Sequence, residues 1–156
     1  MNIIKLIVSI LVCFAAAAIG SAATMPSIPT WYATLNKPSF NPPNWLFGPV
    51  WTILYLMMAV AAYLIWQKGL KNSKVKVALG IFLVQLVLNS AWSIVFFGWH
   101  SLWGGFAVII ALWLAILTTI IKFWPLNPVA GWLLIPYILW VSFASLLNLT
   151  VALLNR

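Results

Sequence analysis

Polar and aromatic side chains that recur at helical spacing are the residues of this sequence most suited to chemistry. Residues three or four positions apart share one face of a helix, and a face turned to lipid needs no polar atoms. We therefore expect three inward faces, formed by Trp51, Tyr55 and Met58, by Gln85, Asn89, Trp92 and Phe96, and by Tyr137, Trp140, Ala144 and Asn148. Together they predict an aromatic pocket for a large, flat, mostly apolar ligand with hydrogen-bonding substituents. The alternative is that the amides only link helices and the aromatic rings only fill space.

A proline-broken aromatic stretch, Trp31–Pro43, precedes the first of these faces. Its three prolines lack amide donors and favour extended backbone before them, which predicts an ordered, non-helical segment. We expect it to cover the pocket as a lid, with a lysine near any ligand carboxylate. The alternative is an interfacial aromatic belt on an ordinary connecting loop. The candidate lid residues are Trp31, Lys37 and Phe40.

The charge composition excludes several classes of chemistry. The 156 residues include eight Lys plus Arg, one His and no Asp or Glu, for a formal net charge of +8. Without side-chain carboxylates we expect no paired-carboxylate catalysis, no Ser-His-Asp triad and no calcium or magnesium cage. Because the sequence has only one histidine and one cysteine, we expect neither a metal site nor a cofactor. Because the basic residues lie between apolar segments, we expect no nucleic-acid partner.

Long apolar segments determine the expected fold class. The composition is 65% hydrophobic, and a membrane-spanning helix needs about 20 mostly apolar residues. We expect an all-α integral membrane protein, one domain over residues 1–156, with an ordered loop between the first two of its five transmembrane helices. A secretory signal is the alternative for the first segment, but its apolar run is long enough to span. The expected spans are residues 5–25, 45–66, 77–97, 102–123 and 128–154.

The lysine distribution predicts the orientation in the membrane. Six lysines fall on the amino-terminal side of such a bundle, whereas Lys37 and Arg156 fall on the other. The positive-inside rule then places the amino terminus inside, with the cytoplasmic (inner) membrane as the expected location. Small residues favour close helix contact in lipid, and we expect a homodimer through a surface of the third helix. That surface comprises Gly80, Val84, Val87 and Ala91.

Three blocks of the sequence are similar to one known family. They are WYATLNKPSFNPPNWLFGPVWTILY at 31–55, LNSAWSIVFF at 88–97 and LLIPYILWVSFASLLN at 133–148. In these blocks the chain resembles the TspO family, the bacterial relatives of the mitochondrial translocator protein. The resemblance implies a five-helix bundle, usually dimeric, that binds porphyrins such as protoporphyrin IX. Animal members also bind cholesterol and ligands of the isoquinoline-carboxamide and benzodiazepine types, although the late Tyr-to-basic cholesterol motif is missing here.

The resemblance also implies roles for particular residues. Trp51 and Asn89 match the pair that hydrogen-bonds a ligand carbonyl, and Trp140 matches a second pocket tryptophan. Bacterial members are credited with light-dependent breakdown of protoporphyrin, which would make Trp51 and Trp140 the catalytic candidates. Further pocket-wall positions are Tyr32, Pro42 and Ala144.

We therefore expect a membrane receptor or binding protein for porphyrins, with roles in tetrapyrrole sensing, transport or degradation. Two alternatives stay open at this point. One is an enzyme that photo-oxidises protoporphyrin IX, and the other is a channel-like or scaffold protein whose pocket is incidental.

Overall fold

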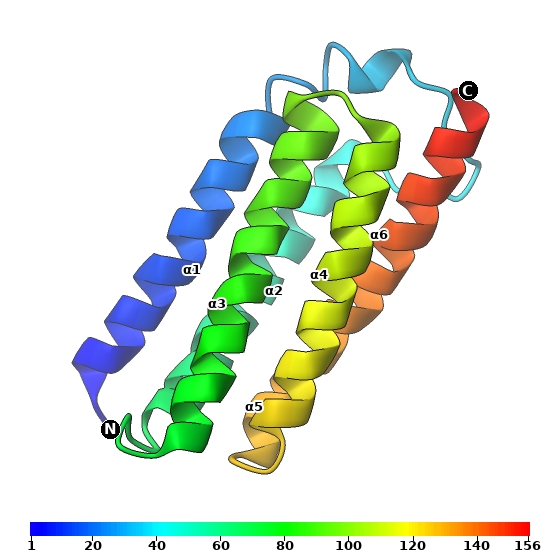
Figure 1. Cartoon of the computed structure of the whole chain (residues 1–156). Coiled ribbons are helices and arrows are strands. Elements are labelled where there is room, and N and C mark those ends of the chain that lie inside the picture. Colours follow the sequence, from blue (N-terminus) through cyan, green and yellow to red (C-terminus); the bar gives the residue numbers. More distant parts are fainter.

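The computed structural model describes residues 1–156 and contains helices but no strands (Figure 1). Five helical segments are long and apolar enough to cross a membrane. This confirms the all-α, five-span fold class. The two chain termini lie at opposite ends of the bundle, as an odd number of spans requires. The elements are α1 Ile3–Thr24, η1 Tyr32–Thr34, α2 Asn44–Trp66, α3 Ser73–Ser93, η2 Ile94–Gly98, α4 Leu102–Phe123, α5 Pro128–Leu133 and α6 Ile135–Leu154.

Side-chain caps define where most of the spans begin. Asn2, Ser101 and Asn127 each accept a backbone N–H from the first turn of the helix that follows. Asn72 does the same for Lys74 at 3.0 Å, so α3 begins four residues before the expected start of the third span. Such a cap satisfies an amide that the helix itself leaves unpaired.

The third span ends in a π-helical turn, η2. The Trp99 amide donates to the Ile94 carbonyl five residues earlier, at 2.8 Å, and this wider turn replaces the last α-helical turn. His100 then adopts a positive φ of 54°, which reverses the chain into α4. π-helical turns often occur at functional sites, and this one sets Phe97 with its ring 5.6 Å from that of Tyr32.

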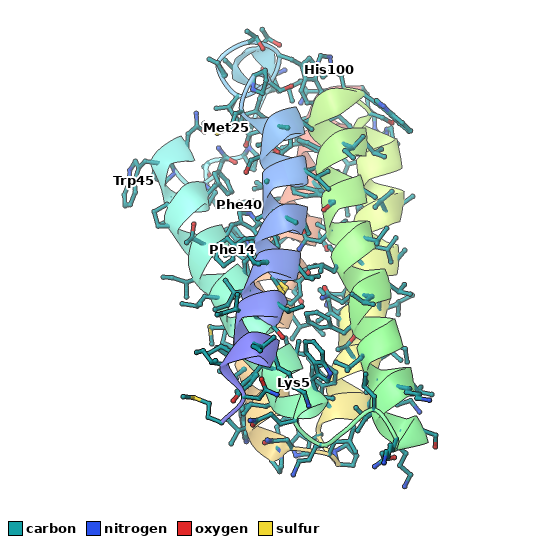
Figure 2. All side chains as sticks on the ribbon, turned by 90° about the vertical axis from the view of Figure 1, so that its left-hand side faces the viewer. Lys5, Phe14, Met25, Phe40, Trp45 and His100 are labelled. Atoms are coloured by element: carbon teal, nitrogen blue, oxygen red, sulfur yellow. The ribbon has the colours of Figure 1, made fainter.

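Prolines shape the two helices that flank the interior. The fifth span breaks between α5 and α6, where Pro136 lies in the first turn of α6 and supplies no amide donor. As a result α2 packs against α5, while α6 packs mainly against α4. Pro49 lies inside α2, and the loop-side end of α2 leans away from α1 (Figure 2). The bundle is therefore wider near the loop than near the amino terminus.

The two halves of the bundle consequently differ in packing. The main core cluster includes Met58, Ile65, Ile116 and Phe123, all fully buried in the half that contains the amino terminus. In the loop-side half, the first two turns of α2 contain no buried residue. This half has room for a cavity.

The loop between α1 and α2 is anchored by hydrogen bonds. Asn36 exchanges two bonds with the side chain of Asn155, at 2.9 and 2.8 Å, and so ties the loop to the end of α6. Ser27 Oγ donates to the Phe97 carbonyl at 2.6 Å. The ordered loop is confirmed, but the expectation of a wholly non-helical segment was wrong for η1. Within Trp31–Pro43 the first proline is Pro38, so nothing prevents the Leu35 amide from closing a 3₁₀ turn on Tyr32.

Gly105 provides a test of how closely α4 approaches its neighbours. A Cβ at this position would lie 2.9 Å from Phe96 Cδ2 and 3.1 Å from Asn148 Oδ1. We predict that Gly105→Ala lowers the free energy of unfolding in detergent by about 1–3 kcal/mol, because the site is overpacked. The matched control is Gly80→Ala, where a Cβ meets nothing within 4 Å. Equal stability of both variants would show that the contacts of α4 with η2 and α6 are looser than described.

Candidate ligand-binding site

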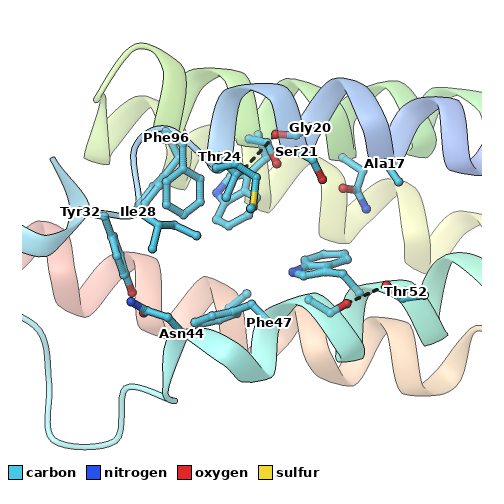
Figure 3. A pocket seen from close by; sticks show the side chains of 18 of the residues that line it. Ala17, Gly20, Ser21, Thr24, Ile28, Tyr32, Asn44, Phe47, Thr52 and Phe96 are labelled. Carbon is cyan, nitrogen blue, oxygen red and sulfur yellow. Dashed lines mark hydrogen bonds between the residues drawn. The ribbon is translucent and has the colours of Figure 1, made fainter. Parts of the chain in front are cut away.

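A cavity of about 840 Å³ occupies the loop-side half of the bundle. Figure 3 shows α1 on one side of it, α2 on the other, and Tyr32 at the loop end. Its walls come from α1, α2, the α3–η2 segment, α6 and the start of the loop. The lining residues are Phe14, Ala17, Ala18, Gly20, Ser21, Thr24, Met25, Ile28, Pro29, Tyr32, Asn44, Trp45, Phe47, Gly48, Trp51, Thr52, Tyr55, Asn89, Trp92, Ser93, Phe96, Phe97, Trp140, Ala144, Leu147, Asn148 and Val151.

Small residues of α1 form one wall of the cavity, which sequence reasoning missed. Ala17, Gly20, Ser21 and Thr24 all lie along it. The signal was visible as a run of Ala and Gly in the first segment, but such a run in lipid is equally typical of close helix contact. Both functions occur here, since a Cβ on Gly20 would lie 3.2 Å from Ser93 Oγ while the neighbouring residues border open volume.

A chain of buried hydrogen bonds forms the floor of the cavity. Tyr55 Oη donates to Asn89 Oδ1 at 2.8 Å, and Asn89 Nδ2 donates to Tyr137 Oη at 2.6 Å. Tyr137 Oη donates in turn to Gln85 Oε1 at 2.7 Å. The chain joins α2, α3 and α6 at the boundary between the hollow half and the packed half. It pairs polar groups that would otherwise be left unsatisfied in an apolar interior.

A second set of bonds fixes the wall near the loop. Trp92 Nε1 donates to Asn148 Oδ1 at 3.0 Å, and Asn148 Nδ2 donates to the Leu102 carbonyl at 2.9 Å. These two bonds link α3, α4 and α6. They engage both the oxygen and the NH₂ group of the Asn148 side chain. Trp92 and Asn148 therefore contribute shape to the cavity more than free polar atoms.

Besides the exposed Trp45, two indole groups at the cavity have no hydrogen-bond partner in the protein. Trp140 Nε1 is buried and unpaired. Trp92 and Trp113 donate indole hydrogen bonds to other side chains, whereas Trp51 does not. The Trp51 ring packs against the rings of Tyr55 and Tyr137, with centroids 5.9 and 6.3 Å away. The cavity thus has donor capacity but no acidic group, which favours a ligand that carries hydrogen-bond acceptors.

The structure brings most of the expected binding residues together. The lining includes Tyr32, Trp51, Tyr55, Asn89, Trp92, Trp140, Ala144 and Asn148. Tyr137 lies beneath the floor as part of the hydrogen-bond chain and is 1% exposed. Pro42 is not part of the lining. Each of the three inward faces expected from helical spacing contains residues buried inside the bundle.

The expected lid residues lie outside the cavity lining. Trp31 stacks on His100, with ring centroids 4.4 Å apart, and Phe40 packs edge-on against Phe143. The Lys37 ammonium donates to the carbonyls of Tyr32 and Leu35, at 2.8 and 3.0 Å, so it holds the loop conformation. The end of the cavity is closed instead by residues just after α1, namely Ile28, Pro29 and Tyr32.

Tyr32 is positioned as a neutral donor at this end. Its side chain is buried, and its Oη donates to Asn41 Oδ1 at 3.0 Å. Burial raises the pKa of the Tyr32 phenol above its usual value, and the bond to Asn41 opposes that change. The phenol therefore keeps its proton at neutral pH and links the start of the loop to its proline-rich part.

The cavity opens sideways along the seam between α1 and α2. Lining residues along both helices are exposed there, including Ser21 of α1, Met25 just after α1, and Trp45, Gly48 and Thr52 of α2. Figure 2 shows Met25 and Trp45 at this loop-side end, with Phe14 further along the seam. Because α1 and α2 are both membrane-spanning, the opening faces the bilayer.

Comparison with known proteins gives a consistent family. A family model described as TspO/MBR family matches residues 9–154. The "Tryptophan-rich protein TspO" of Archaeoglobus fulgidus is 46% identical over 156 residues, covering 99% of both chains. The "Tryptophan-rich sensory protein" of Cereibacter sphaeroides is 38% identical, covering 89% of this chain and 87% of its own. The human "Translocator protein" is 38% identical, covering 78% of this chain and 72% of its own.

The hydrogen-bond chain beneath the cavity gives a stability prediction. Tyr137→Phe removes one hydroxyl and leaves both Gln85 and Asn89 with an unpaired buried group. We expect the free energy of unfolding in detergent to fall by about 1–3 kcal/mol. The control is Tyr63→Phe, which frees only the exposed Gln67 amide to bond with water. If both variants have the same free energy of unfolding, the buried hydrogen-bond chain adds no more stability than a surface hydrogen bond.

Proposed function

We propose that this chain, which belongs to the TspO/MBR family, is a membrane receptor that binds porphyrins and related flat, hydrophobic ligands. The observation that carries the proposal is an aromatic cavity at which the Trp51 and Trp140 indoles have no acceptor in the protein. A ligand with acceptor atoms would supply the missing partners. Protoporphyrin IX, with its flat ring and carboxylates, has this chemistry, and so does the amide carbonyl of an isoquinoline-carboxamide or benzodiazepine-type ligand.

The size and polarity of the cavity support such ligands. Its volume of about 840 Å³ lies in the upper part of the range of roughly 300–1,000 Å³ that is typical of small-molecule sites. The aromatic side chains offer extended faces for a flat ring, and tryptophan and phenylalanine rings contribute apolar area with defined geometry. The chain has no Asp or Glu, so nothing in the cavity repels a carboxylate by charge.

The sideways opening supports uptake from the bilayer. Porphyrins of low polarity partition into membranes, and the seam between α1 and α2 faces lipid at the level of the cavity. Membrane lipid is then the medium through which the ligand arrives. This route leaves binding, sensing and transport equally compatible with the site.

A second candidate function is light-dependent oxidation of a bound porphyrin by dioxygen. Trp51 and Trp140 line the same cavity, so a ring bound there would contact two electron-rich indoles. Product that forms under light with dioxygen, and is absent in the dark or without dioxygen, supports this reaction. If a bound porphyrin stays unchanged under light, the photo-oxidation function is excluded and the receptor function stands.

Removing one free indole donor tests the hydrogen-bonding part of the proposal. We predict that Trp51→Phe weakens protoporphyrin IX binding by about 2- to 12-fold, since a hydrogen bond contributes about 0.5–1.5 kcal/mol. The measurement is a titration of purified protein followed by porphyrin absorbance. The control is Trp132→Phe, an exposed tryptophan outside the cavity lining. Unchanged affinity in the Trp51 variant would place the ligand acceptor elsewhere.

A substitution that fills part of the cavity tests whether the cavity is the porphyrin-binding site. Ala144 lines the cavity one helical turn from Trp140. We predict that Ala144→Leu weakens porphyrin binding by at least about tenfold, because the added side chain competes with the ligand for volume. Ala107→Leu makes the same change on the exposed side of α4 and should leave affinity unchanged. Normal binding by the Ala144 variant, with its helical content retained, would exclude this cavity as the site.

The expected homodimer and orientation also belong to this proposal. Val84 and Val87 are more than half exposed, and a Cβ on Gly80 meets nothing within 4 Å, so this face of α3 is free to approach a second copy. We predict that replacing Gly80 and Ala91 together with Leu shifts the protein from dimer to monomer in light-scattering measurements. Persisting dimers would move the interface to another helix.

Reporter fusions at each terminus test whether the amino terminus faces the cytoplasm.

A further inference from the structure

A separate polar cavity lies at the end of the bundle opposite the loop. It has a volume of about 580 Å³ and sits where α1 begins, α2 ends and α5 begins. Figure 2 shows Lys5 at this end, far from Met25 and His100. We call it the basic cavity, and its relevant residues are Asn2, Lys5, Leu64, Gln67, Lys68 and Asn127.

The two lysines of the basic cavity have no counter-charge in the chain. No Asp or Glu occurs anywhere in the sequence. Lys5 is half-buried, with Nζ 3.5 Å from the Trp66 carbonyl and 5.7 Å from the centroid of the Trp66 ring. The carbonyl and ring fix its ammonium at the cavity while leaving donor N–H groups free. Lys68 is exposed and lines the cavity, and its ammonium makes no hydrogen bond to the protein.

The two asparagines of the basic cavity add neutral donors. Asn2 Oδ1 accepts the amides of Ile4 and Lys5, at 3.1 and 3.2 Å. Asn127 Oδ1 accepts the amide of Val129 at 2.9 Å. Because capping occupies both oxygens, the NH₂ group of each side chain remains available to a ligand. Gln67 Nε2 is bound to Tyr63 Oη at 2.7 Å, so Gln67 contributes an acceptor oxygen.

Two ammonium groups and two amide donors around one cavity are the chemistry that recognises a phosphate. We propose that the basic cavity binds a phosphate group, from the headgroup of an anionic phospholipid or from free phosphate. Both lysines adjoin the ends of membrane-spanning helices, at the depth where lipid headgroups lie. Leu64 supplies an apolar wall on the membrane side, which suits the glycerol end of a lipid. The site is separate from the aromatic cavity and does not depend on the function proposed for that cavity.

The experiment compares two pairs of lysines on the same face of the protein. Lys5→Gln/Lys68→Gln removes the charges of the basic cavity, whereas Lys74→Gln/Lys76→Gln removes two charges outside it. Both variants have the same net charge. Lys5→Arg/Lys68→Arg keeps the charge and can still bind phosphate. Circular dichroism checks that every variant retains its helices.

The lipid arm measures phosphatidylglycerol and phosphatidylcholine adducts by native mass spectrometry, at equal added lipid. We expect the wild type to retain one phosphatidylglycerol per chain in preference to phosphatidylcholine. The preference should fall by roughly 30-fold in the Lys5/Lys68 glutamine variant, since each of the two lysines contributes about 1 kcal/mol near a membrane surface. It should persist in the Lys74/Lys76 control and in the arginine variant.

The phosphate arm titrates inorganic phosphate into the same proteins by calorimetry. Binding that depends on Lys5 and Lys68 supports the site with a free phosphate as its source, and phosphatidylglycerol preference without phosphate binding supports the lipid headgroup. An equal loss in the Lys5/Lys68 and Lys74/Lys76 glutamine variants would overturn the proposal, because the attraction would then belong to the whole lysine-rich face. Absence of both phosphate binding and lipid preference in the wild type would overturn it as well.

Discussion

The need to pair every polar group within a lipid-embedded bundle is the constraint on which this structure depends. A buried amide in hydrocarbon has no water to bind, so it needs a partner in the protein. The Trp140 indole nitrogen is the buried side-chain group that lacks one. The chain from Tyr55 through Asn89 and Tyr137 to Gln85 meets this need with three consecutive bonds. It crosses from α2 to α3 and α6, and it fixes these helices relative to one another.

The same chain separates two regions with different purposes. Below it, an aliphatic and aromatic core fills the interior of the bundle. Above it, the proline in α2 and the small residues of α1 leave open volume between these two helices. The anchored loop then closes the end of the opening. A hollow half is stable here because the packed half and the polar chain hold its walls.

Much of this architecture follows from sequence periodicity. Helical spacing identified Asn89 and Trp140 as inward residues, because polar and amphipathic side chains on lipid-facing surfaces are unfavourable. Helical spacing could not distinguish residues that line the cavity from residues that support it from below. Tyr137, for example, lies on the predicted face but beneath the cavity. Nor could it show that the small residues of α1 border a cavity, since Ala and Gly report close packing and open space alike. The lid was assigned too far along the loop because Lys37 has local carbonyl partners that only the folded chain reveals.

Charge is distributed with a similar division between the two ends. Lysines gather at the amino-terminal end, where headgroups can neutralise them, while the aromatic cavity contains none. Binding of a flat acceptor ligand within that cavity is tested most directly by determining the structure of the protein with protoporphyrin IX. We predict porphyrin density between α1 and α2, with a ligand acceptor within hydrogen-bond distance of the Trp51 or Trp140 indole nitrogen. Density for the porphyrin only on the outer surface of the bundle, with the cavity holding none, would contradict this account.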